Sequence, residues 1–135
     1  MCHATPQSAA ISWGSRKQKS IALSTCEAEI VALSEATKDV VYLRKLVAGM
    51  GEPEPGPTSL STDSQSARDV SYNPEHHQRM KHVQRRHFFV RDMVEQFEIE
   101  VPFVRTHEQL ADFFTKPAKS PKQFHAMRKI IMNEP

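Results

Sequence analysis

The longest regular pattern in the chain is a helical repeat of apolar side chains. Between Ile30 and Val47 these side chains recur at intervals of three and four residues, which places them on one face of an α-helix. Ser24 or Thr25 is a suitable N-cap, because its hydroxyl oxygen accepts a hydrogen bond from a backbone N–H group of the first turn. Gly49 is a typical stop. We therefore predict a helix from about Thr25 to Gly49.

Four shorter helices are predicted further along the chain. The run "SQSARDVSY" (64–72) indicates a short helix that Asp63 or Ser64 begins. A longer periodic run extends from Val83 to Phe97, and "HEQLADFFTK" (107–116) indicates another short helix. A last amphipathic helix follows the proline breaks at 117 and 121.

Three strands are predicted between these helices. Alternating residues at 11–15 indicate a strand that runs into a basic turn, and "TSLST" (58–62) and "IEVPFVRT" (99–106) indicate two more. The proline- and glycine-rich run "GEPEPGPT" indicates a loop. The order strand, helix, strand, helix, helix, strand, helix, helix predicts a layered α/β fold.

The composition fits one intracellular domain. The 135 residues, 39% of them hydrophobic, are enough for one core, and a formal net charge of +2 favours no class of partner by itself. Cys2 and Cys26 make no disulfide framework, which indicates a reducing compartment and two free thiols. No apolar run is long enough to span a bilayer. We expect no membrane partner and a cytoplasmic or nuclear location.

Three acidic residues stand where predicted strands and helices meet. Glu27 opens the first helix, Asp63 follows the second strand, and Asp112 lies on the helix after the last strand. Sites in α/β folds form at such edges, and carboxylates suit Mg²⁺, which activates water and stabilises the leaving oxygen of a phosphodiester. The alternative is that the three acids have ordinary structural roles: Glu27 as a helix-start acid, Asp63 as a capping acid and Asp112 as a solvated helix acid. Glu29 points to the side of the helix opposite Glu27.

Three runs in the chain carry a specific resemblance. They are "ISWGSRKQKSIALSTCEAEIVALSEATKDVVYLRKLV" (11–47), "STDSQSARDVSYNPEHHQRMKHVQRRHFFVRD" (61–92) and "FVRTHEQLADFFTKP" (103–117). In order and spacing they resemble the ribonuclease H domain at the end of the Pol polyprotein of copia-type retrotransposons. The resemblance divides the chain into a non-matching lead-in at 1–10, a ribonuclease H-like domain at 11–117 and a C-terminal helix at 118–135.

The resemblance implies a fold, a reaction and a site. Members of the family have a ribonuclease H fold, a mixed sheet flanked by helices, and bind two Mg²⁺ (or Mn²⁺) ions through four acids to cut the RNA strand of RNA–DNA hybrids. Glu27, Asp63 and Asp112 match three of these acids, as catalytic and metal-binding residues. The implied partners are the hybrid and the reverse transcriptase portion of the parent polyprotein.

The chain also departs from the family. The family's first catalytic aspartate lies on a strand that is hairpin-paired to a second, both before the position of Ile11, whereas the first aspartate here is Asp39. We therefore expect a three-stranded sheet without the first two strands, in which the strand at 11–15 has lost its hairpin partner and exposes an edge that favours self-association. The chain is expected to be inactive alone, and the alternative is a non-catalytic remnant or a nucleic-acid-binding module. The family usually has asparagine at Ser64 and threonine or serine at Cys26.

The segment from 76 to 92 is strongly basic and is either a face that contacts nucleic-acid phosphates or an ordinary solvated helix face. A zinc site is disfavoured, since no cysteine pair lies near its four histidines and His82 to His87 is not a one-face helical spacing. Trp13, Phe88 and Phe89 are expected in the core. The candidate nucleic-acid contacts are Arg79, Lys81, Arg85 and Arg86.

Overall fold

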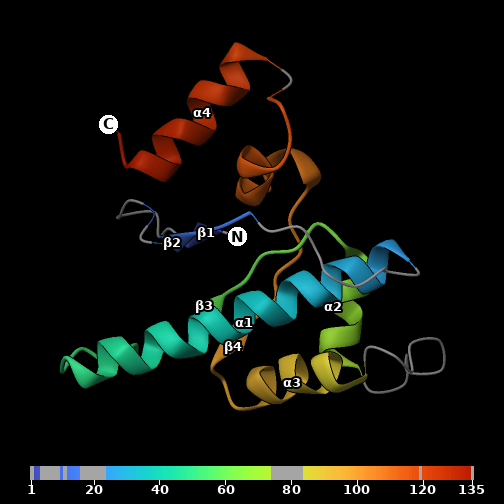
Figure 1. Cartoon of the computed structure of the whole chain (residues 1–135), viewed down its shortest axis with the longest axis vertical. Coiled ribbons are helices and arrows are strands. Elements are labelled where there is room, and N and C mark those ends of the chain that lie inside the picture. The colour runs from blue at the N-terminus through green and yellow to red at the C-terminus, as the bar shows by residue number, and fades with distance from the viewer. Residues whose placement is uncertain are drawn as a thin grey trace. The chain divides into compact units, whose positions relative to one another are not determined.

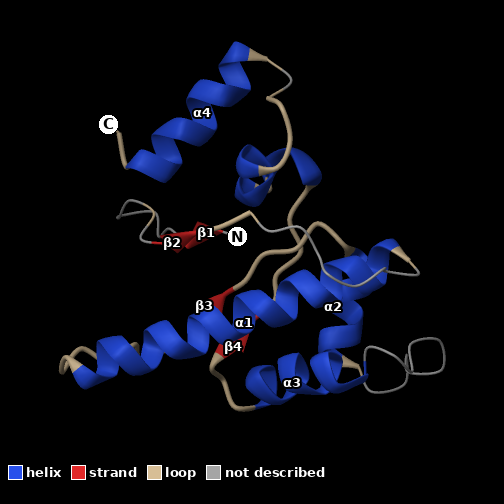
Figure 2. Cartoon of the chain, viewed as in Figure 1, coloured by secondary structure: helices blue, strands red, loops and turns tan. Residues whose placement is uncertain are grey.

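The computed structural model describes residues 2–3, 10, 12–15, 24–73, 84–118 and 120–134 (Figure 1). The chain forms two compact units: unit 1, from Met1–Ser20 with Arg105–Pro135, and unit 2, from Ile21–Val104. Helices dominate and the strands are short, so the structure is of mixed α/β content (Figure 2). Within the described residues, no helix is both long enough and apolar enough to cross a membrane. The predicted sequence division after residues 10 and 117 stays a prediction.

Unit 2 is organised by the long helix α1, Thr25–Gly49. Ser24 has extended backbone angles, and its Oγ accepts a hydrogen bond from the N–H of Glu27 at 3.1 Å. The chain then turns at Gly51, whose φ of 91° would strain any residue with a side chain. The predicted helix is confirmed at both ends, with Ser24 as its cap.

The core of unit 2 is made where α1 packs with α2, Gln65–Tyr72, and α3, Gln84–Glu95. The predicted apolar stripe of α1 is buried as far as Val40, whereas Leu46 is 47% exposed. The strands contribute the inward side chains that close the core. The buried apolar residues are Ile30, Val31, Leu33, Ala36 and Val40 from α1, Ala67 and Val70 from α2, Val90 from α3, and Leu60, Ile99 and Val101 from the strand segments.

The strands of unit 2, β3 (Thr58–Ser59) and β4 (Ile99–Glu100), pair in parallel. Backbone hydrogen bonds continue the pairing beyond the regular strands: the N–H of Leu60 donates to Glu100 O at 2.8 Å and that of Thr62 to Pro102 O at 3.1 Å. Parallel neighbours require a crossover connection, and the chain between β3 and β4 contains α2 and α3. The extended segment predicted at 58–62 is confirmed, and Asp63 follows it directly.

One arginine of α1 holds the loop and both strands of unit 2. The Arg44 side chain is only 16% exposed, and its Nε lies 2.7 Å from Glu98 Oε2. Its Nη1 donates to Gly56 O at 2.7 Å and to Thr58 Oγ1 at 2.9 Å. The guanidinium therefore fixes the proline-rich loop and the approaches to β3 and β4 against α1, because its planar array of donors reaches several acceptors at once.

Unit 1 contains a second pair of strands, β1 (Cys2–His3) and β2 (Ser12–Trp13), which are antiparallel. The predicted strand at 11–15 therefore has a partner in the lead-in. The prediction of a three-stranded sheet in which this strand is unpaired is wrong, because the described strands form two separate two-stranded pairs. That prediction assumed strands of about five to six residues, and strands of two residues fit a shorter stretch. The self-association predicted from the unpaired edge loses this basis.

Most of the described residues of unit 1 from Thr106 onward are helical. The predicted helix at 107–116 occurs as two short 3₁₀ helices, η2 (Thr106–Glu108) and η3 (Leu110–Phe114), rather than as an α-helix. The predicted C-terminal helix is confirmed as α4 (Pro121–Met132), with Ser120 as its N-cap. The rings of Phe113 and Phe124 lie 5.3 Å apart between centroids, so η3 and α4 are joined by aromatic packing.

Candidate functional site

Glu27 lies in the first turn of α1 and is partly buried. Its backbone N–H is satisfied by Ser24, and a carboxylate in the first turn is favoured by the partial positive charge of the helix N-terminus. The position therefore agrees with the interpretation of Glu27 as a helix-start acid, and it leaves the metal-binding interpretation open.

Glu29 lies on another side of the same helix turn. Partial burial raises the pKa of the Cys26 thiol above its ordinary value, and the negative charge of Glu29 raises it further. Cys26 packs against the cluster that Ile30 and Val31 form with Ala67 and Val70 of α2. Glu29 thus acts electrostatically on Cys26, and the raised pKa keeps this thiol protonated near neutral pH.

Asp63 occupies the junction between the β3 segment and α2. Thr62, immediately before it, forms a parallel bridge with Phe103, and Ser64, immediately after it, caps α2 by accepting a hydrogen bond from the Ala67 N–H at 3.2 Å. The backbone N–H of Ser64 in turn donates to Thr62 Oγ1 at 3.2 Å. The interpretation of Asp63 as the capping acid is therefore wrong, because Ser64 performs that role. Asp63 is partly buried.

α1 packs on α2 within unit 2, the unit to which both Glu27 and Asp63 belong. Cys26, the neighbour of Glu27, contacts the cluster that includes Ala67, four residues after Asp63. Asp112 belongs to unit 1. Within the described ranges there is no group of three or more histidine, cysteine, aspartate or glutamate side chains close enough to hold a metal ion. Convergence of all three predicted carboxylates stays a prediction.

Asp112 lies on η3 and has a cationic partner. Its Oδ2 is 2.9 Å from Lys116 Nζ, and the lysine side chain is 57% exposed. An exposed pair of this kind contributes little to stability. The Asp112 side chain is only 20% exposed, so it is less solvated than the interpretation of a solvated helix acid assumed, and metal binding here would have to displace the lysine.

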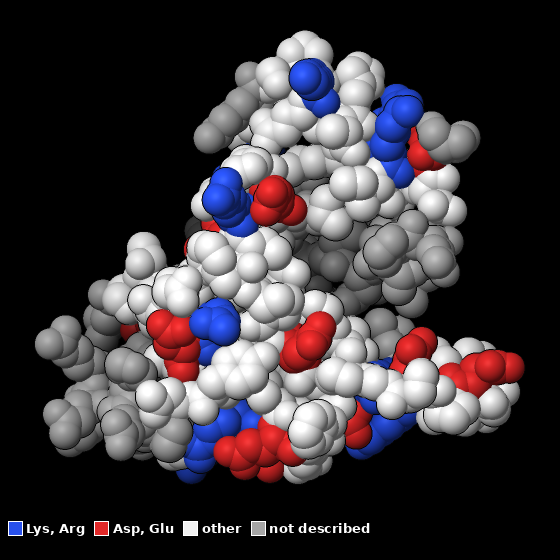
Figure 3. Space-filling model, turned by 180° about the vertical axis from the view of Figure 1, so that it is seen from behind, with Lys and Arg blue, Asp and Glu red and all other residues white. Residues whose placement is uncertain are grey.

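The basic segment continues into α3, where Arg85 is exposed and Arg86 partly buried. Arg79 and Lys81 lie outside the described residues. On the face seen in Figure 3, the described Lys and Arg residues are interspersed with Asp and Glu. The predicted phosphate-binding face is therefore represented in the structure by Arg85 and Arg86, and its function stays a prediction.

His87 is a core histidine. It is 4% exposed, and its Nε2 lies 2.6 Å from the backbone oxygen of Val70. Because a carbonyl oxygen only accepts, Nε2 carries the hydrogen and donates it. Val70 lies in the last turn of α2, where carbonyl groups lack partners within the helix. His87 thus joins α3 to the end of α2, and this use of Nε2 weakens the zinc interpretation further.

Phe88 also differs from its prediction. It was expected in the core, but it is 44% exposed, and the Arg91 guanidinium carbon lies 5.3 Å from the centroid of its ring. Phe89 is partly buried, and the side chain of Trp13 lies outside the described residues. The signal was present in the sequence: with His87 and Val90 facing inward, Phe88 falls on the face that it shares with Arg85, three residues earlier.

The chain is similar to retrovirus-related Pol polyproteins from plant transposons. It is 39% identical over 107 residues to the protein from transposon TNT 1-94 of Nicotiana tabacum, and 35% identical over 107 residues to those from transposons RE2 and RE1 of Arabidopsis thaliana. Each match covers 79% of this chain but only 8%, 7% and 7% of the respective relatives. No protein-family model and no solved structure matches the chain. The similarity supports the assignment of this chain as a fragment of a retrotransposon Pol polyprotein.

Proposed function

We propose that the chain is a ribonuclease H-like segment of a retrotransposon Pol polyprotein and that, within the longer protein, it takes part in hydrolysis of the RNA strand of RNA–DNA hybrids. The observation that carries the proposal is the junction at Thr62–Ser64. There, Ser64 provides the helix cap, so the Asp63 carboxylate is not used for it, and Cys26, the neighbour of Glu27 in α1, packs against the cluster that includes Ala67 of the same helix. The parallel pair β3 and β4, connected through α2 and α3, supports a ribonuclease H-like fold.

The donor chemistry of the candidate residues fits Mg²⁺ or Mn²⁺. Glu27, Asp63 and Asp112 offer only carboxylate oxygens, which hard divalent cations prefer to thiols and imidazoles. When bound, such ions supply an activated water and stabilise the leaving oxygen of a phosphodiester. Asp112 belongs to unit 1, where its Oδ2 lies 2.9 Å from Lys116 Nζ; its inclusion in the set rests on the family resemblance.

Other residues would hold the nucleic acid. Arg85 and Arg86 on α3, with Arg79 and Lys81 before it in the sequence, supply positive charge for phosphate oxygens. Contacts of this kind position a strand without reading its sequence, as suits an enzyme that acts on hybrids by their shape. The partners in this proposal are therefore the hybrid and the reverse transcriptase portion of the same polyprotein.

The 135 residues contain no aspartate before Asp39, which lies within α1, whereas the family resemblance implies an earlier catalytic aspartate. The chain by itself is therefore expected to bind hybrids weakly and not to cleave them. A nucleic-acid-binding module without catalysis is the second candidate. It is favoured by the exposed Arg85 of α3, which offers positive charge to phosphate oxygens without any metal.

A hybrid-cleavage assay with Mg²⁺ and with Mn²⁺ tests the proposal. It compares this chain with a version extended at its N-terminus by the upstream segment of the tobacco relative. Cleavage by the extended chain that is abolished by Asp63→Asn, but not by Asp69→Asn on the neighbouring helix, is the expected result. Binding without cleavage by the extended chain would instead support the second candidate, and cleavage that survives Asp63→Asn would refute the assigned site.

A further inference from the structure

We propose that one face of α4, which carries Lys122 and Lys129, contacts the phosphate backbone of a nucleic acid. The inference rests on the proposed function only in taking nucleic acid, here the RNA–DNA hybrid, as the polyanion. It gives a role to the C-terminal helix, to which neither the three acids nor the basic segment from 76 to 92 belongs. The surface lies wholly within unit 1.

The charged residues divide unequally between the two units. Unit 1, Met1–Ser20 with Arg105–Pro135, contains nine Lys and Arg residues and three Asp and Glu residues, whereas unit 2, Ile21–Val104, contains nine and thirteen. The formal net charges are therefore +6 for unit 1 and −4 for unit 2, a division that the value of +2 for the whole chain conceals. Because positive charge concentrated in one part of a protein attracts polyanions, unit 1 is the stronger electrostatic partner for a phosphate backbone.

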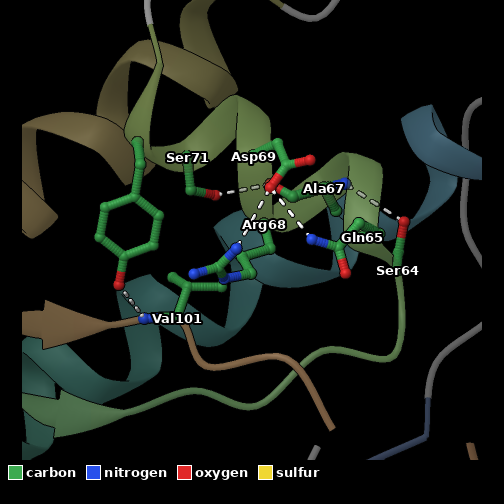
Figure 4. Close-up of polar contacts among 8 residues, drawn as sticks. Ser64, Gln65, Ala67, Arg68, Asp69, Ser71 and Val101 are labelled. Atoms are coloured by element: carbon green, nitrogen blue, oxygen red, sulfur yellow. Dashed lines mark hydrogen bonds and ion pairs between the residues drawn. The ribbon is translucent and has the colours of Figure 1, made fainter. Parts of the chain in front are cut away.

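Arginines of unit 2 also have carboxylate partners. In Figure 4, the Asp69 carboxylate of α2 accepts hydrogen bonds from Arg68 Nη1 and from Gln65 Nε2, each at 3.3 Å. Arg44 Nε lies 2.7 Å from Glu98 Oε2. A phosphate that approached either arginine would compete with a carboxylate that is already in place, so these arginines add little to the attraction of a polyanion.

Two of the three acids of unit 1 pair with basic residues other than Lys122 and Lys129. Asp112 Oδ2 lies 2.9 Å from Lys116 Nζ, and Glu134 Oε2 lies 2.6 Å from Arg128 Nη2. The helix itself contains no aspartate or glutamate between its first and last residues, 121 and 132. The face of α4 that carries the two lysines therefore has no carboxylate of the same helix beside it.

The inward side of α4 is fixed by packing within unit 1. Met127 and Ile131 are 6% and 7% exposed, and the ring of Phe124 lies 5.3 Å from that of Phe113 in η3, between centroids. The backbone N–H of Ala10 also donates to Ile131 O at 2.8 Å. These contacts hold one side of the helix against the rest of the unit, so the opposite side is directed outward.

The outward side of α4 is basic. Lys122, His125 and Lys129 are exposed, and their spacing of three and four residues places them on one face of the helix. The two lysines are seven residues apart, roughly 10 Å along the helix axis. Because phosphates advance about 3.4 Å per step along each strand of a duplex, both ammonium groups can contact the backbone of one nucleic acid molecule.

The same packing favours nucleic acid over an anionic membrane. A helix that binds a lipid surface inserts its apolar face into the headgroup region, whereas Met127 and Ile131 of α4 are buried within unit 1. Ile130 and Met132 are exposed near the end of the helix, by 50% and 60%, so anionic vesicles form one arm of the test. Lysine contacts to phosphate position a nucleic acid without reading its sequence.

Fluorescence anisotropy of a fluorescein-labelled RNA–DNA hybrid, titrated with the full chain at several salt concentrations, tests the proposal. The double variant Lys122→Gln, Lys129→Gln is expected to reduce the slope of log affinity against log salt by about 1.8, since each phosphate contact of a duplex contributes about 0.9. The affinity should then fall by about 60-fold at about 0.1 M salt. The double variant Lys122→Arg, Lys129→Arg should keep both the slope and the affinity, because a guanidinium also binds phosphate.

The matched control is the double variant Lys38→Gln, Lys45→Gln, which removes the same charge from exposed positions of α1 in unit 2 and should leave the slope unchanged. Equal losses for the two double variants would show an effect of net charge alone and would overturn the site. Unchanged affinity of the α4 variant, or no binding by the unmodified chain at low salt, would also overturn it. Tighter binding to phosphatidylserine vesicles than to the hybrid, lost in the α4 variant, would assign the surface to a membrane instead.

Circular dichroism of each variant separates loss of binding from loss of fold. Failure of the proposed function appears as a lack of cleavage by the extended chain. Failure of the α4 surface appears as unchanged hybrid affinity when Lys122 and Lys129 are replaced by glutamine in the unextended chain. The two failures are therefore distinguishable.

Discussion

Replacement of Arg44 by methionine keeps the aliphatic stem of the side chain and removes its hydrogen-bond donors. Arg44 is 16% exposed, and its donors reach Glu98 at 2.7 Å, Gly56 O at 2.7 Å and Thr58 Oγ1 at 2.9 Å. Removal leaves three acceptors in the loop and strands without this partner. Because the same side chain holds α1, the loop and both strands, the loss is expected to destabilise unit 2 as a whole.

The size of the effect follows from the contacts. A hydrogen bond that involves a charged group contributes about 1.5–3 kcal/mol, and a neutral one about 1 kcal/mol. Glu98 is 38% exposed, so water can hydrate its carboxylate when the guanidinium is removed. The contribution of its pair with Arg44 therefore belongs at the lower end of this range. We expect Arg44→Met to lower the free energy of unfolding by about 2–3 kcal/mol.

Urea denaturation followed by far-UV circular dichroism measures this loss, since unit 2 holds most of the helix of the described chain. With a urea slope of about 1–3 kcal/mol/M, the midpoint should fall by about 0.7–3 M. The matched control is Lys38→Met, which removes an exposed pair with Glu35 on the same helix and should change stability by less than about 0.5 kcal/mol. Equal effects of the two substitutions would refute the reasoning.

Three further predictions concern buried polar groups of unit 2. Ser34→Ala should raise the free energy of unfolding, measured by urea denaturation, by up to about 1 kcal/mol. The reason is that Ser34 Oγ is buried and has no hydrogen-bond partner among the described residues. A lower free energy of unfolding would contradict this prediction. His87→Leu should lower it by about 1–3 kcal/mol, since the Val70 carbonyl then loses its donor, and an unchanged urea midpoint would show that the bond contributes nothing. Alkylation of Cys26 by iodoacetamide, followed on its peptide by mass spectrometry, should require a higher pH than a free thiol does, because burial and then Glu29 raise its pKa. The folded state keeps this proton to a higher pH than the unfolded state. The contribution of Cys26 to the free energy of unfolding is therefore fully present below the ordinary thiol pKa and falls as the pH rises above it. An alkylation profile like that of a free thiol would refute the shift.

Local signals in the sequence were sufficient to predict most helices of the described chain. Ser24 and Gly49 mark the ends of α1 through the hydroxyl cap and the glycine turn region, and both effects depend only on residues within a few positions. The end of the 58–62 segment before Asp63 was predictable for the same reason. The 3₁₀ form of η2 and η3 was not predictable, because the spacing of apolar residues over so few positions does not distinguish a 3₁₀ helix from an α-helix.

Long-range contacts could not be read from the sequence. Arg44 and Glu98 are 54 positions apart, and nothing local pairs them. His87 was one of several histidines in a basic run, and its burial depends on where α2 ends relative to α3. Among the acids, the pair between Asp112 and Lys116 joins residues four positions apart in the sequence, and the Lys116 N–H also donates to Asp112 O at 2.8 Å.

One departure from the family resemblance, the serine at position 64, has a structural explanation. The family usually has asparagine there, and serine and asparagine are among the best N-cap residues. Ser64 Oγ accepts the Ala67 N–H at 3.2 Å, and its own N–H donates to Thr62 Oγ1 at 3.2 Å, so the substitution preserves the cap. Had Ser64 been a residue without an acceptor, Asp63 would have been the nearest carboxylate able to satisfy α2, and a capping carboxylate is less available to a metal. The chemistry proposed for Asp63 therefore depends on its neighbour: a change of Ser64 to alanine is more damaging to that chemistry than a change to asparagine.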